Sequence, residues 1–183
     1  MSTERNLAQI ALFTALIAAL GLIPQLTLAF GVPITAQSLG IMLCGTVLGA
    51  RRGGFAALLF VGLVALGLPL LAGGRGGLGL FTSPTAGFLV GFPVAAFCTG
   101  LVMERLRGMA VGLAAGIAAV LGGVVVLYAF GISGMALVLG RSLPEAALLV
   151  TAFIPGDLVK AVLAGLVTAA LYRARPHSIL SRA

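Results

Sequence analysis

Acidic residues are scarce in this sequence, which carries few charges of either sign. The 183 residues include four Asp or Glu, one His, two Cys and no Trp, and charged residues make up 8% of the chain. The four carboxylates are scattered and form no cluster that could hold a metal ion. Cys44 and Cys98 each lie in an apolar segment, without the spacing of a disulfide framework or a metal site. We therefore expect no metal and no cofactor, and we interpret both thiols as packing residues.

Apolar residues, in contrast, are abundant. They make up 61% of the chain, which is far above the range of soluble globular proteins. Several apolar stretches have about the 20 residues that are needed to cross a bilayer. We predict an all-α integral membrane protein in which residues 1–183 form a single domain of six transmembrane helices. The expected spans are 7–23, 32–50, 53–68, 84–103, 109–130 and 155–172, and residues 144–151 could form a further short helix.

Basic residues are distributed unevenly between the two predicted sides of the membrane. One side holds at most three, which are Arg75, Arg141 and Lys160; the other holds eight, which are Arg5, Arg51, Arg52, Arg105, Arg107, Arg173, Arg175 and Arg182. Because cytoplasmic loops carry the excess of basic residues, we predict a protein of the cell membrane with both termini in the cytoplasm. The basic residues form no stripe despite the net charge of +7, so we expect no nucleic-acid partner.

One short motif suggests an enzyme. Gly131-Ile132-Ser133-Gly134 resembles the sequence around the catalytic serine of rhomboid-type intramembrane proteases. A serine nucleophile needs a base within reach. The single histidine, His177, follows the last span on the predicted cytoplasmic side, a membrane thickness away from Ser133. We therefore predict that the protein is not an enzyme.

The sixth span opens with two charged residues next to a long apolar run. Asp157 and Lys160 follow Pro155 and Gly156, where we expect the helix to start. Their spacing places both side chains on one helix face. Asp157 suits the positive end of the helix dipole, whereas Lys160 there favours a bound anion, so the pair predicts a ligand site. Alternatively, Asp157 caps the helix and Lys160 pairs with it or extends to the lipid headgroups.

Two further polar residues are expected on the same outer side. Arg75 lies in a glycine-rich stretch, and Gly74 and Gly76 give this backbone the freedom to turn and to approach a ligand. The Arg75 guanidinium would then be available to an anion, unless the stretch is only a mobile surface loop. Gln37, at the start of the second span, can donate to and accept from a ligand, or it packs against backbone carbonyls between helices.

The first span carries a strip of small residues. Ala11, Ala15 and Ala19 recur every four residues, which allows another helix to approach closely. The strip either packs inside this protein or docks a partner subunit in the membrane.

Several local motifs occur together in the order found in one known family. They are Val32–Gln37, Gly67–Pro69, Gly73–Gly79, Ser83–Phe92 and Phe153–Ala161. On these motifs the chain resembles the BioY family, the biotin-binding membrane subunits (S components) of energy-coupling-factor transporters. The resemblance covers essentially the whole chain.

The resemblance implies a six-helix protein that captures biotin from outside the cell. It also implies that the strip on the first helix, here Ala11 and Ala15, docks a transmembrane coupling subunit that joins two ATPase subunits. This chain has no nucleotide-binding P-loop, so any ATP hydrolysis must come from such a partner. Biotin offers a ureido group, an apolar bicycle and a carboxylate: Asp157 could accept the ureido N–H groups, and Lys160, Arg75 or a helix N-terminus could hold the carboxylate.

One motif departs from the usual family pattern. The fourth span usually starts close to G-P-T-G-G-Y, whereas this chain has Ser83, Ala86 and Phe88 in place of two glycines and the tyrosine. Phe88 cannot supply a hydroxyl, although its ring can still pack against an apolar ligand. Two alternative functions stay open, namely an S component for another vitamin and a structural or assembly protein of the membrane.

Overall fold

Helices form nearly all of the regular structure. The computed structural model describes residues 3–27, 29 and 32–182. In this part of the chain, six long helical segments follow one another: α1 (Thr3–Leu20), α2 (Gln37–Leu48), α3 (Ala50–Ala65), α4 (Ala86–Arg105), the continuous run of α5 (Val111–Val120), η2 (Leu121–Val126) and α6 (Leu127–Leu139), and α8 (Ile154–Ala174). The remaining elements are short: β1 (Leu26–Thr27), β2 (Pro33–Ile34), η1 (Leu78–Thr82), α7 (Leu143–Val150), η3 (Thr151–Phe153), η4 (Pro176–Ser178) and η5 (Leu180–Arg182).

Three of the helical segments are long and apolar enough to cross a membrane by themselves. They are Ala86–Arg105, Val111–Leu139 and Leu143–Ala174. Their outward faces are apolar, and large side chains such as Leu137 and Leu166 are exposed, as expected where lipid is the solvent. The prediction of an all-α membrane protein with six main helices is confirmed.

The second helix is much shorter than the predicted span of 32–50. Strand β2 pairs with β1 in an antiparallel hairpin, with Ile34 opposite Leu26, and α2 begins only at Gln37. At 1.5 Å of rise per residue, twelve residues cover roughly 18 Å, which is less than the bilayer core. The first turn of α2 therefore lies inside the bundle, where Gln37 is buried.

The fifth segment is longer than predicted, because it continues past Phe130 to Leu139. The sequence prediction ended the fifth span at Phe130, just before Gly131 and Gly134. In the structure, both glycines lie within the helix and allow it to pack closely against α4. A Cβ on Gly134 would lie 2.5 Å from Gly87 Cα, and one on Gly131 would overlap the ring of Phe88. The helix ends at Gly140, whose φ of +62° favours glycine.

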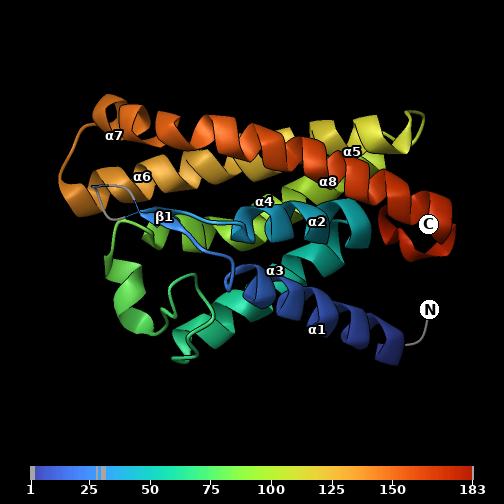
Figure 1. The fold of residues 1–183 in the computed structure, drawn as a ribbon, viewed down its shortest axis with the longest axis horizontal. Helices are drawn as coiled ribbons and strands as arrows, with labels where there is room; N and C mark the ends of the chain where they lie inside the picture. Colours follow the sequence, from blue (N-terminus) through green and yellow to red (C-terminus); the bar gives the residue numbers. More distant parts are fainter. Residues whose placement is uncertain (1–2, 28, 30–31, 183) are drawn as a thin grey trace.

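The helices run roughly along the longest axis of the molecule, and the connections gather at its two ends (Figure 1). Both chain ends lie at one end of the bundle, together with the α2–α3 and α4–α5 connections. Hydrogen bonds join segments at this end; for example, Glu104 accepts from Ala50 N at 2.9 Å, and Arg182 donates to the Arg107 carbonyl at 2.7 Å. The hairpin, the connection after α3 and the α6–α7 turn lie at the opposite end.

The sixth helix does not start freely at Pro155. The expected short helix is present as α7, and η3 connects it directly to α8. The backbone N–H of Ser142 donates to Glu145 at 2.9 Å and completes a capping box at the start of α7. Asp157 thus lies in the first turn of α8, close to the predicted helix start at Pro155, but this turn directly follows η3 and α7.

Candidate ligand-binding site

A small cavity lies where the first turn of α2 meets the first turn of α8. Its volume is about 70 Å³, and β2, α2, the α3–η1 connection, α4, α6 and α8 all contribute to its lining. Of the predicted site residues, Asp157, Lys160, Arg75, Gln37 and Phe88 line this cavity. Gly74 and Gly76 do not.

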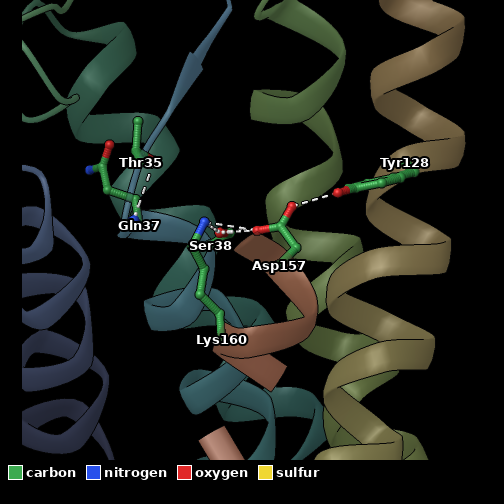
Figure 2. A network of polar contacts seen from close by, with 6 residues as sticks. All are labelled: Thr35, Gln37, Ser38, Tyr128, Asp157 and Lys160. Carbon is green, nitrogen blue, oxygen red and sulfur yellow. Dashed lines mark hydrogen bonds and ion pairs between the residues drawn. The ribbon is translucent and has the colours of Figure 1, made fainter. Parts of the chain in front are cut away.

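Asp157 is the centre of a polar network at the cavity (Figure 2). It is only 5% exposed. Its Oδ1 accepts hydrogen bonds from Lys160 Nζ at 2.8 Å and from Ser38 Oγ at 3.0 Å, and its Oδ2 accepts one from the Tyr128 hydroxyl at 2.7 Å. A buried carboxylate needs such partners. Three helices, α2, α6 and α8, therefore hold this carboxylate in a fixed orientation.

Lys160 completes the network from one turn further along α8. Its Nζ forms the ion pair with Asp157 and also donates to Ser38 Oγ at 3.0 Å. These contacts use two of the three N–H donors of the ammonium group. The predicted pairing of Asp157 with Lys160 is thus present, and the ammonium group still has donor capacity toward the cavity that it lines.

Gln37 connects three segments through its amide. Its Nε2 donates to the carbonyls of Ile17 at 3.2 Å and Leu70 at 3.0 Å, and its Oε1 accepts from Ala72 N at 3.0 Å. All of these partners are backbone groups, which is the packing alternative that the sequence left open. Gln37 therefore positions the α3–η1 connection against α1 and α2, and direct contact with a ligand stays a prediction.

The glycine-rich connection holds Arg75 at the rim of the cavity. Its Nε donates to the Ala72 carbonyl at 3.2 Å, and its backbone pairs with Leu71 in an isolated bridge. Burial lowers the pKa of the Arg75 guanidinium. Gly74 has a φ of +69°, and a Cβ on Gly76 would overlap the Leu68 carbonyl. The two glycines therefore shape the connection that carries Arg75, and their contact with a ligand stays a prediction.

Aromatic rings form the apolar wall of the site. Phe88 meets Tyr128 edge to face with ring centroids 6.4 Å apart, and it meets Phe153 at 6.0 Å. Phe92 and Leu127 extend the same wall. The cavity thus has a charged end at Asp157 and an apolar, aromatic end at Phe88.

Sequence reasoning missed two members of the network, Ser38 and Tyr128. Tyr128 offered a signal, because it is one of two tyrosines and lies in a long apolar run, where a phenolic hydroxyl needs a partner. Ser38 had no distinctive pattern. It is 119 residues from Asp157 in sequence, and no local spacing connects them.

The alanine strip on α1 faces outward. Ala11, Ala15 and Ala19 are all exposed, while Thr14 and Ile17 on the other face of the helix are buried. Thr14 donates to the Ala56 carbonyl of α3 at 2.9 Å. The alternative that the strip packs inside this protein is therefore wrong.

Fold and site together define a helical membrane protein with a polar and aromatic cavity of the kind that binds small molecules. A model of the BioY family matches residues 1–177. The chain belongs to the BioY family.

Individual relatives agree with this assignment. The biotin transporter BioY of Rhodobacter capsulatus is 56% identical over 98% of this chain and 99% of its own length. The biotin transporter BioY of Rhizobium etli is 55% identical over 91% of each protein. Among solved structures, the S-component for biotin from an ECF-type ABC transporter superposes with a TM-score of 0.88 at 29% identity, covering 94% of this chain and 95% of that one.

Proposed function

We propose that this protein takes up biotin, as the substrate-binding S component of an energy-coupling-factor transporter. The observation that carries the proposal is the cavity with a charged end at Asp157 and an aromatic end at Phe88. The relatives named as biotin transporters and the fold shared with a biotin S-component support it.

The chemistry of the cavity matches the three parts of biotin. Asp157 accepts a ureido N–H group, because a carboxylate is a strong acceptor and its three present hydrogen bonds leave lone-pair capacity for one more. The Phe88 and Phe153 rings pack against the bicycle. Lys160 and Arg75, the two cations of the lining, hold the carboxylate.

Biotin binding requires the cavity to open. Its volume of about 70 Å³ has room for a few water molecules and is below the range of roughly 300–1,000 Å³ that is typical of ligand pockets. The α3–η1 connection is the element best suited to move, because four of its glycines, Gly67, Gly73, Gly74 and Gly77, have positive φ and a glycine backbone changes conformation at little steric cost. The hydrogen bonds of the Gln37 amide to Leu70 and Ala72 would hold this connection in its closed position.

The energy for uptake comes from partner subunits in this proposal. The exposed strip of Ala11, Ala15 and Ala19 on α1 docks a transmembrane coupling subunit, and two ATPase subunits bind to that subunit. The complex lies in the cell membrane, with the cavity near the outer side and both termini of this chain in the cytoplasm.

Equilibrium binding of radiolabelled biotin to the detergent-purified protein tests the proposal. We expect saturable binding with one site per chain, and no competition from riboflavin or thiamine. Phe88→Ala should weaken binding by removing ring contact, whereas Phe55→Ala, which alters an exposed ring on α3, should not. Absence of saturable biotin binding, or displacement of biotin by thiamine or riboflavin, would contradict the assignment.

A further inference from the structure

A second hollow, a groove, lies between α5 and α8 on the side of the bundle. Its volume is about 1290 Å³, against about 70 Å³ for the ligand cavity. The two helices lie side by side near the end of the bundle that carries the C-terminus (Figure 1). Large side chains border the groove, among them Leu113, Val162 and Leu166, which are 59%, 61% and 62% exposed.

Small residues on the facing sides of the two helices create this groove. A Cβ on Gly165 would lie 2.7 Å from the Gly112 carbonyl oxygen, and one on Gly112 would lie 3.2 Å from the Cβ of Ala169. The two backbones are therefore in contact. Because glycine has no side chain to fill the space above this contact, a trough remains between the taller residues on either side.

The groove is charged at one end. Arg107, Arg173 and Arg182 line it there, together with Tyr172. Arg182 donates from Nη1 to the Arg107 carbonyl, but its Nε is buried and has no hydrogen-bond partner among the described residues. Within the same residues, no carboxylate pairs with Arg173 or Arg182. Cations without a carboxylate partner at the end of an apolar groove favour the binding of an anion there.

The surroundings of Arg182 agree with this charge distribution. Burial lowers the pKa of its guanidinium, and the neighbouring positive charge of Arg107 acts in the same direction, while Tyr172 acts against both. A phosphate group placed here would relieve the repulsion between the guanidinium groups.

We propose that this groove is a binding site for an anionic glycerophospholipid. Its phosphate would lie against Arg173 and Arg182 and accept from the Tyr172 hydroxyl, and an acyl chain would follow the trough over Gly116 and Gly165. An apolar groove with one cationic end has the complementary shape and charge of such an amphiphile. The basic end is also on the predicted cytoplasmic side, where a basic pocket between helices meets anionic lipid headgroups.

Native mass spectrometry of the delipidated protein with added phosphatidylglycerol or phosphatidylcholine tests the charged end. We expect tighter binding of phosphatidylglycerol. Arg173→Gln and Arg182→Gln should each weaken it about five-fold, since one basic residue near an anionic lipid surface contributes roughly that factor. Arg175→Gln is the matched control, because it removes the same charge at an exposed position outside the groove. Equal binding of the two lipids, or equal loss in the control, overturns the proposal.

A second variant tests the apolar part of the groove. A Cβ on Gly116 would meet only the Ala161 carbonyl oxygen, at 4.0 Å, so Gly116→Leu fills the trough without a backbone clash. We expect it to weaken phosphatidylglycerol binding at least ten-fold while biotin binding is kept. Gly62→Leu is the control, because a Cβ on this glycine of α3 meets nothing within 4 Å. Unchanged lipid binding in Gly116→Leu overturns the proposal, as does loss of a co-purifying protein without loss of lipid.

Discussion

At the scale of single residues, the site is built around a carboxylate that would be costly in a membrane without its partners. Insertion of an acidic or basic side chain near the middle of a membrane helix costs roughly 3 kcal/mol. Lys160 supplies the opposite charge at 2.8 Å, and Ser38 and Tyr128 supply two hydroxyl donors. The cavity therefore presents a carboxylate that is oriented before any ligand arrives, which lowers the ordering cost of binding.

Tyr128→Phe tests the orientation of Asp157. The change removes the 2.7 Å hydrogen bond to Oδ2 and keeps the ring that packs on Phe88. A hydrogen bond to a charged group contributes about 1.5 kcal/mol or more, so we expect biotin affinity to fall roughly ten-fold. Tyr172→Phe alters the other tyrosine, which is outside the cavity, and should leave affinity unchanged. Equal affinity in the two variants would mean that the Tyr128 hydroxyl is irrelevant to binding.

The Asp157–Lys160 pair allows a test that separates ligand binding from charge balance. Asp157→Asn should cost about 2 kcal/mol in biotin affinity, roughly thirty-fold, through loss of charge-assisted hydrogen bonds. Lys160→Ala should lower the affinity for biotin more than it lowers the affinity for an analogue that has an amide in place of the carboxylate. The double variant Asp157→Asn/Lys160→Gln removes the pair without leaving one buried charge.

We expect this double variant to recover the expression and thermal stability that a single change loses. It should not recover biotin affinity in the equilibrium binding assay. Full recovery of affinity would show that the two side chains only neutralise each other, and the ligand-site interpretation of the pair would then fail.

At the scale of elements, local patterns in the sequence predicted some features and missed others for identifiable reasons. The i, i+3 spacing was enough to pair Asp157 with Lys160, because both belong to one helix. Residues 32–36 were predicted to begin the second span, yet they contain β2 and a short link to α2, since the hairpin partner β1 lies outside that local pattern. The fifth span was predicted to end at Phe130 but continues to Leu139, because Gly131 and Gly134 pack closely against Phe88 and Gly87 of α4, a contact that no local pattern indicates.

Helix α1 carries the prediction that concerns a partner. Ala15→Trp places a large side chain on the exposed face of α1, so it should leave biotin binding nearly intact while separating this helix from a docked coupling subunit. Co-purification with the coupling subunit should therefore fall. The measurement is the amount of coupling subunit that is recovered with the tagged chain.

Two controls accompany Ala15→Trp. Ile17→Trp changes a fully buried residue of the same helix, and it should reduce folding and biotin binding. Val125→Trp changes an exposed residue of η2, and it should leave both biotin binding and co-purification unchanged. If Val125→Trp lowers co-purification as much as Ala15→Trp, the strip has no special part in docking.

At the scale of the whole molecule, the cavity and the eight basic residues of the predicted cytoplasmic side lie at opposite ends of the bundle. The hairpin and the α3–η1 connection, which contribute to the cavity, are at the end opposite both chain ends (Figure 1). Composition alone predicted the membrane class, since 61% of the residues are hydrophobic. The connection of α7 to α8 and the position of the start of α2 inside the bundle depend on contacts between distant segments, so composition could not predict them.

The orientation of the bundle in the membrane is the last prediction. Eight of the eleven basic residues belong to one predicted side, and this bias places that side in the cytoplasm. Single cysteines are introduced in a variant in which Cys44 and Cys98 are replaced by alanine, and intact cells are treated with a membrane-impermeant thiol reagent. Cysteines at positions 75 and 141 should react from outside, and those at 52 and 105 only after the membrane is permeabilised. Reaction of both sets from the same side would show that the helices do not cross the membrane in the proposed order.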